Sequence, residues 1–594
     1  MSNNLQTLRH SAAHLMASAI QKLYPEAKFG VGPALADSFY YDIELKHQLT
    51  EDDLKKIENK MKALQQENLP YEREEMDIDD AIKLFTGLKQ PYKVELLNDL
   101  KNHGTTSASE IYGNENERSK AQGPRSKVTI YKTGDFIDLC RGPHVKSTKD
   151  VKEFKLLKVA GAYWRGDENN KMLTRVYGAA FADKKSLADY LRMLQEAQKR
   201  DHKILGPKLD LFVFNELVGP GLPLWTPKGT ILRDVLDNFI WELRSKKGYE
   251  KVEIPHITKK ELYEISGHWD KFKNELFRIT TREGHEFAMK PMNCPHHTQI
   301  YDRRPHSYRE LPQRYANTTM CYRDEQTGEL AGLSRLRAFT QDDAHVFCRQ
   351  SQIEQEFMTC WDIIDEFYGA FGFNLEPRLS LSDPNNMKAY LGDKKIWQEV
   401  EDILRQIVKK RKIKAPEQTG EAAFYGPKID FMSKDSLGRE WQVATIQLDM
   451  NMPKNFNLTC VNEKGEDERI VMLHCAVMGA IERFLSILIE HTAGVFPAWL
   501  SPVQVALLPV SPEKHLEYSQ KLAHGLREQG ARVWIDDSDE SVGKKIRNSE
   551  QQKIPYILVI GDKEMESNKL AVRRQGERET VEMSVDEVVE KLQR

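Results

Sequence analysis

The sequence is poor in cysteine, has no long apolar run and carries no large excess of either charge. Its seven cysteines, an odd number among 594 residues, are scattered without regular spacing. This pattern excludes a small secreted protein stapled by disulfides and predicts a reducing compartment, by default the cytoplasm. No apolar run approaches membrane-spanning length, and His14 interrupts the only stretch, Ser11 to Ile20, that could imitate a signal peptide. We therefore expect no membrane partner.

The charge balance does not by itself indicate a nucleic-acid partner. Lys and Arg number 87 against 90 Asp and Glu, which leaves a formal charge of −3 and no global basic field. A local basic face on a neutral body is compatible with this balance. The chain is too long for one hydrophobic core and predicts roughly three to five domains.

The most informative stretch is Met320 to Cys348, which predicts a strand, a turn-prone loop and a second strand. Alternation in the second strand places Phe339, Gln341 and Asp343 on one face. An aromatic ring, an amide and a carboxylate, together with Arg323 before the loop, suit a nucleotide beside an amino acid. An ordinary antiparallel hairpin with a charged solvent face fits the spacing equally well.

A second set of chemically interesting residues lies near the N-terminus. A helix predicted over Leu5 to Leu23 carries His10 and His14 four residues apart. Far downstream, the run Asp138 to His144 adds Cys140 and His144 after a strand at Val128 to Tyr131. Two His, one Cys and one His could be four tetrahedral zinc ligands, or a metal-free cleft whose imidazoles position water for hydrolysis. Residue types and spacing leave both interpretations open.

The remaining chain gives a coarse map of elements. We expect a helix and then a strand over 51–75, an exposed loop over 98–127, a connecting helix over 186–203, a helix over 230–247, a strand over 249–254, a strand over 441–449 and a helix that runs to His491. From Pro502 onward, strands over 503–508, 532–535 and 556–560 alternate with helices over 515–529 and 542–553, which predicts a mostly parallel sheet. No glycine-rich phosphate loop follows the first of these strands.

The segment from Met320 to Cys348 resembles motif 2 of class II aminoacyl-tRNA synthetases, and its Thr-Gln-Asp-Asp-Ala-His run is similar to the threonyl-tRNA synthetase family. Gly221 to Pro255 resembles motif 1 and Gly479 to Phe484 motif 3. The resemblance covers nearly the whole chain. It implies an α+β multidomain protein: an α+β editing domain (1–185), a linker helix (186–207), an antiparallel-sheet catalytic core (208–500) and an α/β anticodon-binding domain (501–594).

The resemblance to bacterial-type members, without their N-terminal ubiquitin-like domain, implies an enzyme. It would activate L-threonine with ATP to threonyl-adenylate, transfer it to tRNA(Thr) and hydrolyse mischarged seryl-tRNA(Thr). Motif 1 implies a homodimer. The alternatives are a non-aminoacylating paralogue that acts as a threonine- or tRNA-binding regulator, and a synthetase-like enzyme that confers resistance to an inhibitor.

The resemblance also implies roles for individual residues. Catalytic residues would be Arg323, Lys428 and Arg483; ATP would contact Arg323, Glu325, Phe339, Gln442 and Arg483, with Mg²⁺ bound to its phosphates. Threonine would contact Gln341, Asp343, Tyr425 and Gln447. One Zn²⁺ per subunit would be held by Cys294, His345 and His474. His10, His14, Asp138, Cys140 and His144 would form the editing site, and Glu564 and Arg573 would read the anticodon.

The implied zinc ion and the implied editing site explain each other. Valine is nearly isosteric with threonine, and an apolar pocket separates such pairs only by roughly 100-fold. A metal that chelates both the amine and the hydroxyl would reject valine. Serine also has both groups and lacks only a methyl, worth about 1–3 kcal/mol, so serine should be activated and later removed.

Some positions depart from the family pattern or resist simple interpretation. Cys475 stands where arginine is usual, Ala480 where serine is common and Asp539 where asparagine is commoner. Gln442 and Gln447 have opposite parity, so in a regular strand they would point to opposite faces. Either they serve different sites or a bulge lies between them.

Overall fold

The computed structural model describes residues 2–107, 125–167, 169–567 and 569–593, and the chain divides into two compact units, Met1–Gln195 and Glu196–Arg594. The expected linker helix is two helices, α7 (Lys184–Arg200) and α8 (His202–Lys208). Asp201 interrupts them because its backbone leaves helical geometry and its carboxylate caps α8 by accepting the N–H of Lys203. The finer domain boundaries stay predictions.

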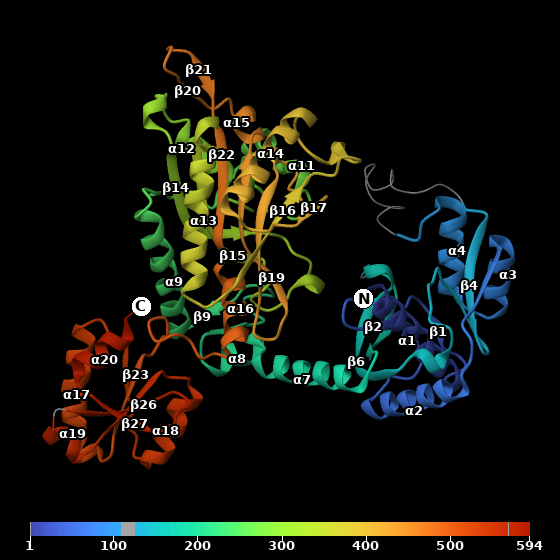
Figure 1. Ribbon diagram of the computed structural model, residues 1–594, viewed down its shortest axis with the longest axis horizontal. Coiled ribbons are helices and arrows are strands. Elements are labelled where there is room, and N and C mark those ends of the chain that lie inside the picture. The colour runs from blue at the N-terminus through green and yellow to red at the C-terminus, as the bar shows by residue number, and fades with distance from the viewer. Residues whose placement is uncertain (1, 108–124, 168, 568, 594) are drawn as a thin grey trace. The chain divides into compact units, whose positions relative to one another are not determined.

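In the first unit, α1 (Ser2–Leu23) packs on β2 and β7 of a four-stranded sheet (Figure 1). The sheet has the order β1 (Lys28–Phe29), β2 (Phe39–Glu44), β7 (Met172–Phe181), β6 (Glu153–Tyr163), and α2 (Glu51–Glu67) packs beside α1. A second sheet contains β3 (Glu72–Asp77), β4 (Lys127–Thr133) and β5 (Phe136–Leu139). The helix predicted from Leu5 to Leu23 is confirmed by α1, whose apolar residues Leu8, Ala12, Leu15 and Ala19 are buried.

The loop expected over 98–127 is wrong at its start. Helix α4 (Pro91–His103) extends into it, because Leu97 and Leu100 are buried against α3 (Ile78–Gly87) and β4. Residues 108–124 lie outside the described part of the chain.

The second unit is built on an eight-stranded sheet. Its order is β10 (Glu250–Lys251), β14 (Gln313–Tyr322), β15 (Ala338–Cys348), β22 (Val471–Ala480), β19 (Glu440–Asp449), β18 (Lys428–Lys434), β16 (Leu375–Leu381), β17 (Glu417–Thr419). All neighbours are antiparallel except the outer pairs β10–β14 and β16–β17. The predicted strand–loop–strand is therefore confirmed. The strand expected over 249–254 is only two residues long, since it pairs at the edge with β14 alone.

Helix α13 (Ile353–Gly369) packs on β19 and β22, α16 (Ile481–Thr492) packs on β15 and β22, and α9 (Pro227–Ser245) packs against α13. The Arg244 guanidinium of α9 forms an ion pair with the Asp342 carboxylate of β15, and both side chains are almost completely buried. The other oxygen of Asp342 accepts the N–H groups of Val477 and Met478 at 3.1 and 2.9 Å. This buried pair, which costs about 3–5 kcal/mol to break from one side, fixes α9, β15 and β22 together.

The chain ends in the predicted α/β domain. Strands β24 (Val533–Ile535), β23 (Val505–Pro509) and β25 (Tyr556–Ile560) are parallel, and β26 (Leu570–Arg574) and β27 (Thr580–Met583) extend the sheet antiparallel. Helices α17 (Pro512–Glu528) and α18 (Val542–Gln551) pack on β23. No helix of the described chain is long and apolar enough to cross a membrane.

Candidate functional site

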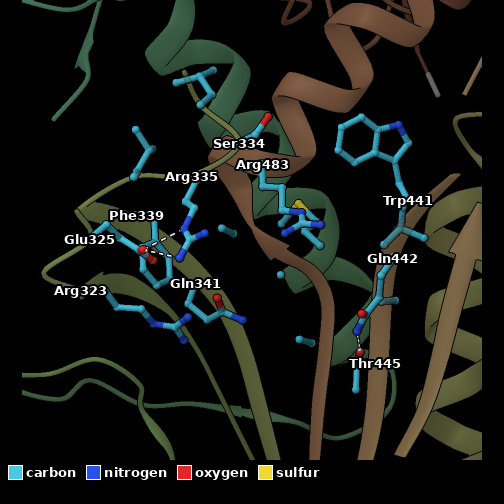
Figure 2. Close-up of a pocket in the computed structure, with 18 of the residues that line it drawn as sticks. Arg323, Glu325, Ser334, Arg335, Phe339, Gln341, Trp441, Gln442, Thr445 and Arg483 are labelled. Carbon is cyan, nitrogen blue, oxygen red and sulfur yellow. Dashed lines mark hydrogen bonds and ion pairs between the residues drawn. The ribbon is translucent and has the colours of Figure 1, made fainter. Parts of the chain in front are cut away.

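A cavity of about 630 Å³ opens on the eight-stranded sheet (Figure 2). Its walls come from β15, β19, β22, α16 and the loop between β14 and β15. One wall carries the residues around the loop and the opposite wall carries Trp441, Gln442 and Thr445, with Arg483 between them. The lining residues are Glu275, Arg323, Glu325, Leu333, Ser334, Arg335, Leu336, Phe339, Gln341, Trp441, Gln442, Val443, Ala444, Thr445, Ala476, Met478, Gly479, Ala480 and Arg483.

Two arginines in this cavity have no carboxylate partner among the described residues. The Arg323 guanidinium lies 5.2 Å from the centre of the Phe339 ring, and its buried Nε donates no hydrogen bond. Arg483, in the first turn of α16, is exposed to the cavity, although partial removal from water lowers its pKa. Unpaired guanidinium groups beside an aromatic ring suit phosphates and a flat base.

The loop adds a residue that sequence reasoning missed. Arg335 lines the cavity and donates from Nε to the Glu325 carboxylate at 2.8 Å, while Arg337 Nε donates to the Glu325 carbonyl at 2.9 Å. Glu325 is thus buried and held in place by its own loop. The signal was available, since Arg335 lies in the stretch that the sequence singled out. The direction in which the Arg335 side chain points could not be predicted, because a loop has no periodicity from which to assign a face.

A bulge resolves the parity of the two glutamines. β18 pairs Phe431 with Ala444 but Met432 with Gln442, so Val443 is an extra residue in β19. Gln442 therefore faces the cavity, and its amide donates to Asp430 at 2.7 Å and to Thr445 at 2.9 Å.

The predicted catalytic Lys428 does not line the cavity. It is the first residue of β18, and its ammonium pairs with Asp430 at 2.7 Å. The predicted ATP residues, Arg323, Glu325, Phe339, Gln442 and Arg483, all line it, and so does Gln341.

Cys294, His345 and His474, here named the core cluster, bring their ligand atoms within 4.8 Å of one another, and all three residues are buried. His345 of β15 is the registered neighbour of His474 on β22, and Cys294 begins α12 (Cys294–Tyr301). His345 Nε2 lies 3.1 Å from His474 Nδ1. The structure therefore brings together the three predicted zinc ligands.

The outer nitrogens of the two imidazoles have fixed partners. His345 Nδ1 lies 2.8 Å from His297 Nδ1, and His474 Nε2 lies 3.1 Å from the Asp449 carboxylate. Burial lowers the pKa of His345 and raises that of the Cys294 thiol. Two oriented imidazoles, one thiol and a carboxylate behind one imidazole form the donor set that zinc prefers. The residues present fit the ion.

Three of the four predicted threonine residues lie beside the core cluster. Asp343 approaches His345 Nε2 to 3.7 Å, the Tyr425 ring lies 5.2 Å from the His474 ring, and Gln447 registers with His474 across the strands. Burial raises the pKa of Asp343 to about 6. Gln341 instead lies in the cavity, two positions along β15.

His10, His14, Cys140 and His144, here named the N-terminal cluster, also bring their ligand atoms within 4.8 Å. Cys140 Sγ lies 3.3 Å from Nε2 of both His10 and His144. A cavity of about 360 Å³ lies beside it, lined by Gln6, Thr7, His10, Pro33, Ala34, Gly142 and Pro143. Burial lowers the pKa of all three imidazoles and raises that of the Cys140 thiol to about 12. The cluster therefore presents neutral rings next to open space.

Two further residues of this cluster were missed from the sequence. Lys93 of α4 places its ammonium 2.5 Å from the Asp138 carboxylate and 3.1 Å from the Tyr41 hydroxyl. Asp138 in turn lies 3.4 Å from His14 Nε2 and accepts the Tyr41 hydroxyl. A buried lysine on an otherwise ordinary helix has no local sequence signal.

The predicted anticodon residues lie on separate elements of the last domain. Glu564, in α19 (Asp562–Ser567), accepts the Gly561 N–H at 2.9 Å, and Arg573 of β26 pairs with Glu550 at 2.5 Å. Of the positions that depart from the family pattern, Ala480 lines the large cavity. Cys475 is buried, and its carbonyl accepts a hydrogen bond from Arg244 at 3.3 Å. Asp539 lies in the segment between β24 and α18.

Three family models match the chain. Residues 277–492 match the "tRNA synthetase class II core domain (G, H, P, S and T)", 504–594 the "Anticodon binding domain", and 128–177 the "Threonyl and Alanyl tRNA synthetase second additional domain". These spans contain all residues that line the large cavity except Glu275, nearly all of the α/β domain, and Cys140 and His144 of the N-terminal cluster.

Relatives match nearly the full length of the chain. The threonine–tRNA ligase of Cytophaga hutchinsonii is 45% identical over 98% of this chain and 87% of the relative, and that of a Geobacillus species is 44% identical over 100% and 89%. Among solved structures, the RNA binding domain of threonyl-tRNA synthetase from Cryptosporidium parvum has a TM-score of 0.63 at 36% identity, covering 66% of this chain and 97% of that one. A putative threonyl-tRNA synthetase from Aeropyrum pernix has a TM-score of 0.59 at 30% identity, covering 66% and 94%. With its cavity, both clusters and full-length likeness, this chain belongs to the threonine–tRNA ligase family of class II aminoacyl-tRNA synthetases.

Proposed function

We propose that the chain activates L-threonine with ATP and transfers the threonyl group to tRNA(Thr). The observation that carries this is the course of β15, which passes from the cavity at Phe339 and Gln341 to the core cluster at His345. A nucleotide in the cavity and an amino acid beside the cluster would meet along one strand. A non-aminoacylating regulator is not favoured, since Arg323, Arg483 and all three predicted zinc ligands are present.

The chemistry needs positioning and charge neutralisation more than a protein nucleophile. A carboxylate oxygen of threonine attacks the α-phosphorus of ATP, pyrophosphate leaves, and threonyl-adenylate forms. A ribose hydroxyl of the tRNA then attacks the carbonyl carbon, the ester bond forms, and AMP leaves with the hydroxyl proton. Arg323 and Arg483 would hold the phosphates together with Mg²⁺, Phe339 would stack on adenine, and Gln341 would orient the carboxylate.

Cys294, His345 and His474 would hold one Zn²⁺ per chain. When bound, the ion supplies coordination to both the amine and the hydroxyl of threonine. Valine has the amine but lacks the hydroxyl, so it would be rejected. Asp343 would accept the threonine hydroxyl proton in a hydrogen bond, while Tyr425 and Gln447 close the pocket.

The N-terminal cluster would hydrolyse seryl-tRNA(Thr) without a metal. Its one contacting carboxylate, Asp138, is already neutralised by Lys93 at 2.5 Å. A buried ammonium opposes a nearby dication, whereas neutral imidazoles beside a cavity can accept a proton from water. Water then attacks the ester carbonyl, and the tRNA hydroxyl leaves with a proton.

Three further points belong to this proposal. Leu217, Val213, Phe214, Val218 and Leu224 are exposed apolar side chains just before α9, which supports a homodimer through the motif 1 region. All seven cysteines are unpaired, which supports the cytoplasm. The anticodon of the tRNA would contact Glu564 and Arg573.

Amino-acid-dependent pyrophosphate exchange tests the central claim. We expect strong exchange with threonine, weaker exchange with serine and almost none with valine, with one zinc ion per chain by elemental analysis. Folded, zinc-loaded protein that gives no exchange with any amino acid would support the regulator instead.

A further inference from the structure

His202, the first residue of α8, is buried and uses both ring nitrogens. Its Nε2 accepts the backbone N–H of Leu333 at 3.0 Å, and its Nδ1 lies 2.6 Å from the Glu490 carboxylate. A backbone N–H can only donate, so Nε2 carries no hydrogen and Nδ1–H is the donor to Glu490. Although Asp201, His202 and Glu490 are close enough to suggest a metal site, this ring has no lone pair left for an ion.

Each end of this contact leads to a wall of the large cavity. Leu333 lies in the loop of one wall. Glu490, on α16, also pairs with Arg439 at 2.5 Å, and Arg439 lies 5.4 Å from the centre of the Trp441 ring on the opposite wall. The series Leu333, His202, Glu490, Arg439, Trp441, which is buried as far as Glu490 and partly exposed beyond it, therefore connects the two walls from behind.

The loop lies so close to His202 that only glycine fits at one position. Gly332 has φ +56°, and a Cβ there would lie 2.3 Å from His202 Nε2. A second contact, Ser334 Oγ to Ser486 Oγ at 2.9 Å, holds the next part of the loop to α16. Burial raises the pKa of Glu490, but hydrogen bonds from His202 and its ion pair with Arg439 lower it overall, so the carboxylate is charged.

We propose that His202 is a positioning residue for ATP. It fixes the loop wall of the cavity and, through Glu490 and Arg439, sets the distance between the loop wall and the Trp441 wall. His202 touches no reacting atom. The proposal rests on the proposed function, because it assigns the cavity to ATP.

Two substitutions at His202 separate its two contacts. His202→Asn places an amide N–H near Nδ1 and keeps the donor to Glu490, but leaves the Leu333 N–H buried without an acceptor. His202→Gln places an amide oxygen near Nε2 and keeps that acceptor. We expect His202→Asn to raise the KM for ATP about five- to tenfold, with kcat and the KM for threonine within about twofold, and His202→Gln to raise it less. The exposed His524→Asn should change nothing.

Hydrogen exchange of the Leu333 amide in the protein without ATP gives a readout independent of activity. It should be faster in His202→Asn than in His202→Gln or His524→Asn. If wild-type protein exchanges no pyrophosphate, the proposed function fails, while the amide exchange still tests the loop contact. An unchanged KM for ATP in an active, folded His202→Asn protein would overturn the proposal. Should that variant not fold, Arg439→Gln at the half-exposed end must raise the KM for ATP about threefold, and no rise overturns it.

Discussion

The N-terminal cluster in the first unit and the core cluster in the second are built from the same two residue types. Both bring their ligand atoms within 4.8 Å. They differ in the charges around them. In the core cluster, Asp343 and Asp449 lie 3.7 and 3.1 Å from the imidazoles and have no Lys or Arg partner in the described chain. In the N-terminal cluster, Lys93 neutralises the single carboxylate, Asp138.

This difference teaches that a set of histidines and cysteines does not define a metal site by itself. Two unneutralised carboxylates favour a dication, while a buried ammonium disfavours one. The same rings can then serve as ligands in one place and as proton acceptors in the other. Four substitutions test whether charge is the right distinction.

The largest effect is expected from cysteine removal. Cys294→Ala should lose zinc and lower threonine-dependent pyrophosphate exchange about 1,000-fold, because the donor set of the ion is incomplete. The matched Cys140→Ala should keep one zinc per chain and full exchange. A wild-type content of two zinc ions, falling to one in Cys140→Ala, would break the comparison.

The second largest effect is expected from removing the buried ammonium of Lys93. Lys93→Met leaves Asp138 buried without a cation, and we expect a loss of about 3 kcal/mol in the free energy of unfolding of the first unit. Calorimetry on the full chain measures it. Lys101→Met, exposed on the same helix, is the control and should cost little. An unchanged transition in Lys93→Met would show that the charge distinction has no energetic weight.

Removing one imidazole tests the hydrolytic role. His144→Ala should slow hydrolysis of seryl-tRNA(Thr) about 100-fold and leave threonine activation unchanged, since general-base catalysis of this size is typical. The assay is release of serine from pre-charged tRNA, with the exposed His103→Ala beside it. Equal loss in pyrophosphate exchange would mean that the two clusters do not act separately.

The smallest effect is expected from changing Asp449, the carboxylate that contacts the predicted zinc ligand His474. Asp449→Asn removes the charge 3.1 Å from His474 Nε2 and should weaken zinc binding about tenfold in a competition with a chelator. The exposed Asp467→Asn should not. Unaltered affinity would leave Asp343 as the relevant carboxylate.

The order of elements along the chain was predicted well because the signals are local. Helical periodicity predicted α1 and α9, and alternation predicted β15. Turn-prone residues predicted the loop between β14 and β15. Errors occurred where a non-local partner decides. The strand expected over 249–254 is cut to two residues by edge pairing, and α4 extends into an expected loop because α3 covers it.

The sequence by itself determined the residue types and their spacing: the three arginine and aromatic positions of the cavity, the ligand set of the core cluster, and the four His and Cys residues near the N-terminus. Only the tertiary structure decided what surrounds them. Lys93 beside Asp138, Arg335 on Glu325 and His202 between Leu333 and Glu490 join residues distant in sequence or held in irregular loops. Burial and charge act through space, so their effects depend on neighbours that no local pattern records.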